Sequence, residues 1–287
     1  MKNVTDLNLE KDNAGSFPIR QMKGATGTES GAGAPQMRAP DISVIAPLWN
    51  EKQNVRPLVD RILQAFQNEP RSIELILVDD VSTDGTWEEM LEVQRNETRL
   101  RPLRLARHCG QSAALWAGFT ASRGAIIATL DGDLQNDPAD LPRMMTMLNA
   151  SDMVCGARAR RMDTPVRRIS SKVARWARRI VLGVDFRDTG CNLRVFKRSV
   201  IPTLFPFDGL HRFMPILAHG AGAVVTETSV THHPRTAGKS KYGVWNRLGR
   251  GILDLTMVAL YRRRQFVRLE AIEHPASASK QSPSPSK

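Results

Sequence analysis

Cysteine is scarce in this chain of 287 residues, which contains only Cys109, Cys155 and Cys191. The three residues lie far apart, form no Cys-x-x-Cys pair and have no histidine at zinc-ligand spacing. The sequence therefore contains neither a zinc motif nor a disulfide framework. We expect three reduced thiols, as in a cytoplasmic protein.

Long apolar runs are also missing. A helix that spans a bilayer needs about 20 apolar residues, whereas the best candidate, GILDLTMVAL at 251–260, is half that length and contains Asp254. Residues 1–40 are too polar for a signal peptide. We therefore expect no transmembrane helix and no secretory leader.

Aromatic residues are few, at 6% of the chain, although basic residues are abundant. The net charge is +12 and the pI is about 10.2, which favours an anionic partner. The charge is concentrated in 156–182 and 235–268, each with nine Lys or Arg and one acid. No nucleic-acid recognition motif is present, so we expect a phosphorylated ligand or an acidic membrane surface rather than nucleic acid.

Apolar, β-branched segments alternate with amphipathic ones in the first half of the chain. Strands are predicted at 42–49, 73–80, 103–108, 124–131 and 152–158, and helices at 51–66, 82–94, 111–122 and 138–150. Such alternation predicts an α/β fold whose mainly parallel sheet is covered by helices on both faces. Ligands of such sheets bind beyond the carboxyl ends of the strands.

The alternation stops after residue 158. A helix is predicted at 164–182, strands at 191–196 and 223–234, and a basic amphipathic helix at 242–264. We expect a tail at 1–40, a catalytic domain at 41–240, the basic helix within 241–268 and a second tail at 269–287. The tails are rich in small and polar residues, which cannot build a core.

Two aspartates, Asp131 and Asp133, follow the fourth predicted strand in the segment TLDGDLQNDP at 129–138. Alternate side chains at a strand end point the same way, so both carboxylates approach one position. Without a cation each would raise the pKa of the other. The pattern predicts a site for Mg²⁺ or Mn²⁺, to which Gln135 would add an oxygen ligand.

The order of motifs over about residues 41–245 resembles family 2 glycosyltransferases of GT-A fold. The motifs are APLWNE, VDDVSTDGT, GQSAALWAGF, LDGDLQNDP, GAR and RTAGKSKYG. Within the family they resemble the polyprenyl-phosphate branch, which includes dolichol-phosphate mannose synthases and undecaprenyl-phosphate sugar transferases. The resemblance implies transfer of a hexose from GDP-mannose or a UDP-hexose to a polyprenyl phosphate, with inversion and with a metal ion.

The resemblance also implies residue roles. Asp131, Asp133 and Gln135 would surround the metal, and Asp131 would also belong to the donor site. Lys241 and Arg235 would close over the donor phosphates. The nucleotide pocket would be lined by Pro47, Asn50, Glu51, Asp79 and Asp80.

The acceptor of this branch is a phosphate monoester, which needs fixed cations more than a general base. Arg158, Arg167 and Ser171 stand where the branch places its acceptor-phosphate contacts. Arg194, in CNLRVF, is a further candidate. Asp133 and Arg194 are therefore the expected catalytic residues.

The chain departs from the family pattern in three places. Val81 stands where VDDGS is common, and Gln111 stands where the family often has lysine, which leaves the role of position 111 open. The QxxRW signature of many processive members is absent. The pair His232 and His233 is a further possible metal ligand, although a solvent-facing strand end is the more common context.

Two questions stay open at this level. If the acceptor were a sugar hydroxyl, a carboxylate base would be needed, and the candidates are Asp163, Asp185 and Asp188. The basic helix at 242–264 either packs on the sheet or lies in a membrane interface. We expect a peripheral enzyme on the cytoplasmic face of the membrane, with an integral membrane partner as the alternative.

Overall fold

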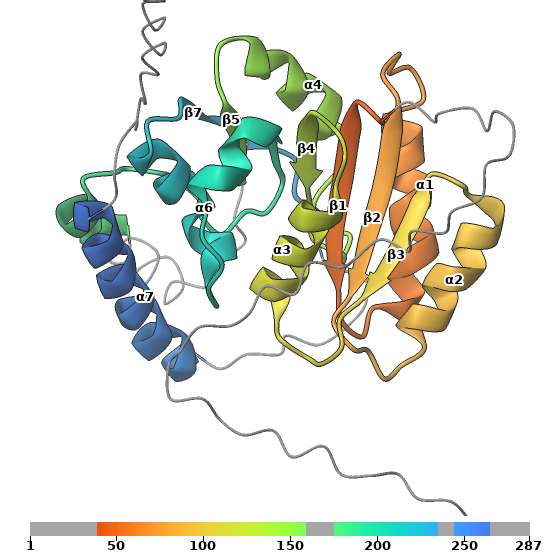
Figure 1. The fold of residues 1–287 in the computed structure, drawn as a ribbon, viewed down its shortest axis with the longest axis horizontal. Helices are drawn as coiled ribbons and strands as arrows, with labels where there is room; N and C mark the ends of the chain where they lie inside the picture. The colour runs from red at the N-terminus through yellow and green to blue at the C-terminus, as the bar shows by residue number, and fades with distance from the viewer. Residues whose placement is uncertain (1–38, 159–174, 235–243, 265–287) are drawn as a thin grey trace, which may run out of the picture. The chain divides into compact units, whose positions relative to one another are not determined.

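The computed structural model describes residues 39–158, 175–234 and 244–264. Within these, a seven-stranded sheet has the order β3-β2-β1-β4-β6-β5-β7 (Figure 1). The strands are β1 Ile42–Leu48, β2 Ile73–Asp79, β3 Leu100–Arg104, β4 Ile126–Thr129, β5 Met153–Arg158, β6 Arg194–Lys197 and β7 Val225–Val230. This mainly parallel sheet confirms the predicted α/β class.

Strand β6 is the antiparallel member of the sheet and separates β4 from β5. Its register places Arg194 opposite Thr129 of β4 and Cys155 of β5. Because β6 runs the other way, its amino end lies at the edge where the parallel strands have their carboxyl ends. The residues that begin β6 are thereby brought to the edge where ligands bind in such sheets.

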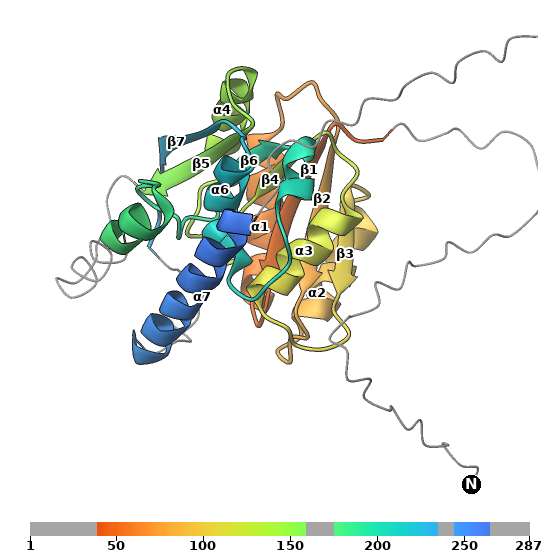
Figure 2. The same cartoon turned by 60° about the vertical axis from the view of Figure 1, so that its left-hand side comes forward.

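The helices form a layer on each face of the sheet (Figures 1 and 2). One layer contains α1 Val55–Ala65, α2 Thr86–Asn96 and α4 Asp140–Thr146, with the short 3₁₀ turns η1 Lys52–Asn54 and η2 Met147–Asn149. The other contains α3 Gln111–Ala121, α6 Leu210–Gly220, η3 Arg198–Thr203 and α7 Val244–Arg264. Strand residues alternate between the two cores, since Val44 and Ala46 face the first and Ile45 the second.

The third strand was predicted at 103–108, and this prediction is wrong. Strand β3 runs from Leu100 to Arg104, where Leu100 pairs with Leu75 and Arg104 with Asp79. Its polar, proline-containing sequence does not resemble a buried strand. Pro102 is tolerated because β3 is the edge strand, where one side of the backbone needs no partner.

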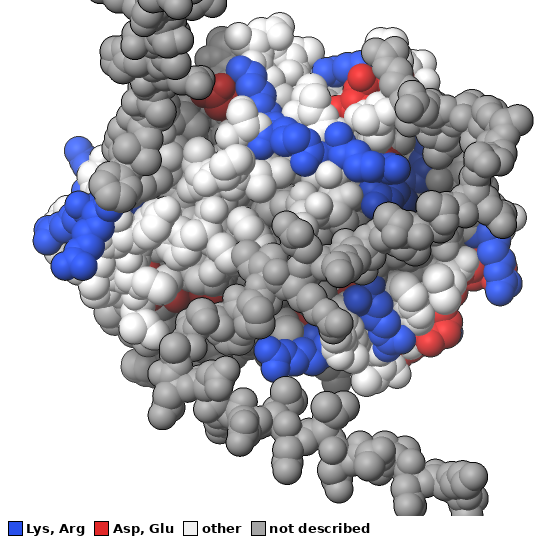
Figure 3. Space-filling view, in the orientation of Figure 1, with Lys and Arg blue, Asp and Glu red and all other residues white. Residues whose placement is uncertain are grey.

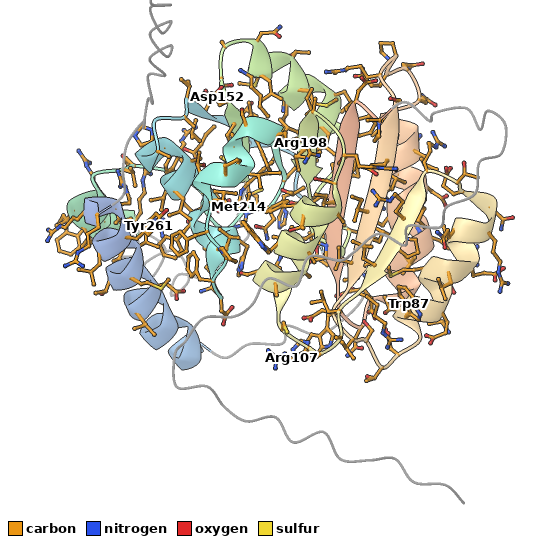
Figure 4. The ribbon with its side chains drawn as sticks, viewed as in Figure 1. Trp87, Arg107, Asp152, Arg198, Met214 and Tyr261 are labelled. Carbon is orange, nitrogen blue, oxygen red and sulfur yellow. The ribbon has the colours of Figure 1, made fainter. Side chains whose placement is uncertain are left out.

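The basic C-terminal helix is present as α7, close to the predicted 242–264. Part of its apolar face packs on the protein, because Leu255 and Ala259 contact the core beneath α6 and Val258 is fully buried. Tyr261, labelled in Figure 4, stacks obliquely on Phe205 with ring centroids 4.2 Å apart. Within the described residues, no helix combines the length and the apolar character that crossing a bilayer requires.

Candidate functional site

The candidate site lies at the edge of the sheet where β1, β2, β3 and β4 end and β6 begins. The labels of Figure 4 mark the two edges of the sheet: Arg107, in the loop after β3, lies near the lower edge, which carries the site, whereas Asp152 and Arg198 lie near the opposite, upper edge. The predicted donor-site residues that the structure describes lie in the last residues of β1 and β2 or just after β1, β2 and β4, at this lower edge. The predicted clustering at the carboxyl ends is therefore observed.

The Asp131 carboxylate is held by amide side chains from three segments. Its Oδ1 accepts hydrogen bonds from Gln111 Nε2 at 2.7 Å and from Asn192 Nδ2 at 2.9 Å. Asn136 Nδ2 lies 3.4 Å from Oδ2, a long contact. The position whose role the sequence left open, Gln111, therefore contacts the first aspartate of the D-G-D segment directly.

The pKa of Asp131 is raised, first by burial and then by the charge of nearby Asp133. The hydrogen bond from Asn192 and the positive charges of Arg194 and Arg158 oppose this shift without cancelling it. An aspartate whose pKa is raised by burial and by a neighbouring carboxylate is what a cation-binding site shows before its cation is bound. The donor set is all oxygen, as Mg²⁺ and Mn²⁺ prefer.

The D-G-D segment packs tightly against the end of β1. A Cβ at Gly132 would lie 2.1 Å from Leu48 Cδ2 and 3.2 Å from the Pro47 carbonyl oxygen, so only glycine fits between the two aspartates. Asp133 Oδ1 accepts the Gln135 N–H at 3.2 Å, which closes the loop. The carboxylates of Asp131 and Asp133 therefore fit a divalent cation whose shell ligands from the substrate would complete, and the part of Gln135 as a ligand stays a prediction.

The histidine pair at the end of β7 is attached to the same loop. His232 forms an isolated antiparallel bridge with Asn136, and the His233 N–H donates to the Gln135 carbonyl at 2.8 Å. The His233 ring contacts Asp137 through Nε2 at 2.9 Å. His233 is thus directed to Asp137, whereas His232 stays a candidate ligand. In the described part of the chain, no three His, Cys, Asp or Glu side chains are grouped as metal ligands.

Asp79, the last residue of β2, and Asp80, the next residue, are buried and hydrogen-bonded within the protein. Asp79 accepts the Ser82 N–H at 3.1 Å and contacts Arg104 Nε at 3.1 Å. Asp80 accepts the N–H groups of Cys109 and Gly110, both at 2.8 Å. These carboxylates fix the loops around the expected nucleotide pocket, and their direct contact with the nucleotide stays a prediction.

The loop after β1 is tied to the loop after β2. The Asn50 N–H donates to Ser82 Oγ at 2.8 Å, and the Glu51 N–H donates to Thr86 Oγ1 at 2.9 Å. Pro47 lies just upstream, within β1. The predicted nucleotide residues of these loops therefore form one connected rim, and their contact with a nucleotide stays a prediction.

Backbone strain is concentrated at this rim. Asn50, Val81 and Leu134 have φ values of 54°, 59° and 60°, in the left-handed region that side chains other than glycine rarely adopt. They follow β1, β2 and β4, respectively. Val81 is the position where the family pattern often has glycine, and its φ supplies the physical reason.

An aromatic pair stands beside the rim. The rings of Trp49 and His108 stack with centroids 4.5 Å apart and an interplanar angle of 28°. His108 Nδ1 lies 2.9 Å from Asp80 Oδ2, so the pair is connected to the loop after β2. Sequence reasoning did not identify this pair, because its members follow different strands.

The two arginines expected at the acceptor phosphate or the reacting centre are both engaged. Arg158 forms a two-point ion pair with Asp188, with Nε to Oδ2 at 2.7 Å and Nη2 to Oδ1 at 2.9 Å. Arg194 is 1% exposed, and its Nη2 donates to the Thr189 carbonyl oxygen at 2.9 Å. Their roles toward the acceptor stay predictions. Arg167, Ser171, Arg235 and Lys241 lie outside the described residues.

Sequence reasoning missed two residues of the site, Asn136 and Asn192, which are 4% and 5% exposed. A signal for Asn192 was present, since CNLRVF has polar residues at alternate positions, 192 and 194, of an otherwise apolar strand. Within the part of the chain that the structure describes, Asn192 Oδ1 and Arg194 Nε are buried without a hydrogen-bond partner. Asn192 is the residue whose amide N–H donates to Asp131 Oδ1.

Comparison with known proteins gives a family match. The model of glycosyl transferase family 2 matches residues 43–205. A dodecaprenyl-phosphate galacturonate synthase from Rhizobium johnstonii is 41% identical over 229 residues, which cover 78% of this chain and 68% of that protein. An undecaprenyl-phosphate 4-deoxy-4-formamido-L-arabinose transferase from Aeromonas hydrophila is 34% identical, over 71% of this chain and 63% of that protein. The chain thus spans about two thirds of the length of these relatives.

Solved structures agree on the fold. Glucosyl-3-phosphoglycerate synthase from Mycobacterium tuberculosis, in complex with Mg²⁺ and UDP, superposes with a TM-score of 0.58 at 19% identity, covering 78% of this chain and 79% of that one. A mannosyltransferase from Pyrobaculum calidifontis, in complex with GDP-mannose and Mn²⁺, gives 0.57 at 20% identity, covering 78% and 65%. At these identities the likeness concerns the fold alone.

Proposed function

Because this chain belongs to glycosyl transferase family 2 and is a glycosyltransferase of GT-A fold, we propose that it transfers a sugar from a nucleotide sugar to a polyprenyl phosphate. The observation that carries the proposal is the carboxylate pair Asp131 and Asp133 beside the loops that follow β1 and β2. The names of the related synthase and transferases support a polyprenyl-phosphate acceptor.

The donor would bind along the rim, with its diphosphate at Asp131, Asp133 and Gln135. A divalent cation bound there would supply positive charge to the diphosphate as it leaves. The protein's contribution would be to bring the carboxylates of Asp131 and Asp133, with the amide oxygen of Gln135, to one position before the donor arrives. The tight packing of Gly132 on Pro47 and Leu48 keeps that position constant.

Two of the three carboxylates that could activate a sugar hydroxyl acceptor are engaged in ion pairs. A phosphate monoester is already ionised near neutral pH, so it attacks the sugar without a strong base. A hydroxyl acceptor would need one, yet Asp185 and Asp188 each pair with an arginine, Arg175 and Arg158. The third candidate, Asp163, lies outside the described residues. These ion pairs favour the phosphate acceptor over the hydroxyl alternative.

The donor is proposed only as a class. GDP-mannose and UDP-hexoses are the donors that the resemblance implied, and the related proteins are named for galacturonate and for a formamido-arabinose. We expect inversion at the sugar carbon, because in a single displacement the acceptor phosphate attacks from the face opposite to the departing nucleoside diphosphate.

We further propose that the enzyme works as a peripheral membrane protein. Helix 175–182 exposes Trp176 and Ile180, which are 65% and 62% exposed, and α7 exposes Leu253 and Leu260, which are 70% and 57% exposed. Arg262 joins the two helices by donating to the Leu182 carbonyl oxygen. Basic side chains gather at the left of Figure 3, where the end of α7 lies. Apolar side chains framed by arginine suit an anionic membrane surface, such as the cytoplasmic leaflet.

A donor screen tests the proposed function. The enzyme is incubated with short-chain polyprenyl phosphate, Mn²⁺ and one labelled donor at a time: GDP-mannose, UDP-glucose, UDP-galactose or UDP-galacturonate. One donor is expected to yield a labelled lipid whose anomeric configuration is opposite to that of the donor. No labelled lipid with any nucleotide sugar would contradict the proposal.

A further inference from the structure

Asp131 Oδ1 accepts two strong hydrogen bonds from amide groups that come from opposite sides of the site. Gln111 Nε2, at 2.7 Å, belongs to the first residue of α3, and Asn192 Nδ2, at 2.9 Å, belongs to the segment before β6. Both bonds end on the same oxygen. Among the described residues, this arrangement leaves Oδ2 with only the 3.4 Å contact from Asn136.

The chemical type of these donors matters. An ionised carboxylate has about four lone-pair positions, and two amide N–H groups occupy those of Oδ1. Amides are neutral, so they orient the carboxylate and leave its charge available for a cation, whereas a lysine at position 111 would neutralise it. The two amide donors therefore fix one oxygen of Asp131 and leave the other to bind a ligand.

The two donors are themselves well fixed. Asn192 is 5% exposed, and its position before β6 is held because its carbonyl oxygen accepts Thr129 Oγ1 at 2.7 Å. Gln111 is anchored by its neighbour Ser112, whose Oγ lies 2.7 Å from His211 Nδ1 and accepts the Gly209 N–H at 3.0 Å. These contacts tie the start of α3 to the start of α6. The backbone positions from which both donors reach Asp131 are thereby held in place.

We propose that Gln111 and Asn192 are positioning residues that hold Asp131 Oδ1, so that Oδ2 faces the divalent cation of the donor diphosphate. The inference rests on the proposed function only in taking a metal–nucleotide complex as the ligand. Residues that orient a metal ligand typically contribute 10-fold to 100-fold in metal affinity. Loss of either residue is therefore expected to weaken binding of the metal rather than binding of the sugar or of the acceptor.

Mn²⁺ binding tests this inference without turnover. Free Mn²⁺ is measured by electron paramagnetic resonance during titration of the full chain with UDP or GDP present. Gln111→Leu and Asn192→Leu keep side-chain volume but remove the N–H donors, and the apparent Kd for Mn²⁺ is expected to rise about 10-fold to 100-fold. The control Gln94→Leu, at an exposed position of α2, should bind Mn²⁺ like the wild type.

Kinetics separate positioning from a general structural role. With the donor found in the screen, the variants should need more Mn²⁺ for half-maximal activity and regain most of kcat at saturating Mn²⁺. If Gln111→Leu does not fold, Gln111→Met replaces it, since methionine is unbranched like glutamine. Thermal melting of each variant establishes that it is folded.

The outcomes distinguish this inference from the proposed function. Unchanged Mn²⁺ affinity in folded variants, or no Mn²⁺ binding by the wild type with either nucleotide, overturns the inference. Weakened Mn²⁺ binding in the variants supports it, even if the wild type fails to glycosylate polyprenyl phosphate. In that case the proposed acceptor is wrong and the positioning role stands.

Discussion

Arg158 and Asp188 join the end of β5 to the segment before β6 through two parallel bonds, Nε to Oδ2 at 2.7 Å and Nη2 to Oδ1 at 2.9 Å. Burial opposes the charge of Arg158, but the pairing outweighs it and raises the pKa of Arg158. Asp188 also accepts the Gly190 N–H at 3.3 Å. The pair therefore holds in place the segment before β6, which positions Asn192 and Arg194 at the site.

Asp188→Asn is expected to destabilise the protein. The change leaves the Arg158 charge mostly buried without its partner, which costs about 3 kcal/mol, a loss on the order of 10 °C in melting temperature. Thermal melting checks this against Asp185→Asn, which breaks the exposed pair with Arg175 and should hardly change the melting temperature. Equal melting of Asp188→Asn and wild type would show that the pair has no structural role.

Val81→Gly is expected to stabilise the protein, although it removes a side chain. A β-branched residue at φ 59° carries strain of about 1–3 kcal/mol, and glycine adopts this conformation freely. Glycine costs less than about 1 kcal/mol in extra unfolded-state entropy. Urea unfolding should show a gain of roughly 1 kcal/mol, whereas Val224→Gly, at an exposed valine outside the left-handed region, should give no gain. A loss at position 81 would mean that Val81 packing outweighs its strain.

The pH dependence of stability should include a contribution from Glu74. Burial opposes its ionisation, but bonds from Ser43, Arg101 and Arg123 outweigh burial and hold the pKa of Glu74 below its ordinary value. A carboxylate with a lowered pKa in the folded state stabilises the protein above its unfolded pKa of about 4.3. This stabilisation disappears as the pH falls from there through the folded pKa.

Glu74→Gln should therefore lose stability at pH 7, and the difference from wild type should shrink as the pH falls below about 4.3. Urea unfolding midpoints between pH 7 and pH 3.5 measure the difference. Glu92→Gln breaks an exposed pair with Arg95 on α2 and should show little difference at any pH. A Glu74→Gln difference that stays constant or grows toward low pH would refute the assignment.

Membrane association should depend on the exposed apolar residues of helix 175–182 and α7. Trp176→Ala together with Leu253→Ser should reduce flotation with anionic liposomes at least about 10-fold, because each side chain contributes about 1.5–3 kcal/mol when buried in lipid. Leu91→Ser, on α2 in the opposite helix layer, is the matched control. Full flotation of the double variant, or no flotation of the wild type, would exclude this surface as the membrane contact.

Much of the fold was predictable, because its signals are local. The apolar runs at β1, β2, β4 and β5 gave the parallel strands, and the D-G-D segment gave the centre of the site. The prediction misplaced β3 because the proline and arginines of this edge strand do not give the apolar pattern expected of a buried strand. The antiparallel insertion of β6 depends on pairing between distant segments, which no local pattern specifies.

The site was only partly predictable for the same reason. The spacing of Asp131 and Asp133 at a predicted strand end indicates a site in the sequence. Gln111 and Asn192, in contrast, join it only because the start of α3 and the segment before β6 meet beside Asp131. Arg194 was chosen for its charge, and its near-complete burial could not be foreseen without knowing where α6 packs. Resemblance supplied roles for the rim residues, and the structure supplied their partners.

The most direct test of the central claim compares two acceptors that differ by one phosphate. The wild-type enzyme, its preferred labelled nucleotide sugar and Mn²⁺ are incubated with polyprenyl phosphate or with the matching free polyprenol, and the labelled lipid is quantified. We expect labelled lipid from the phosphate alone, and a loss of at least about 100-fold in Asp131→Asn. Equal labelling of the free alcohol, or full activity of Asp131→Asn, would contradict transfer to a phosphate at this carboxylate site.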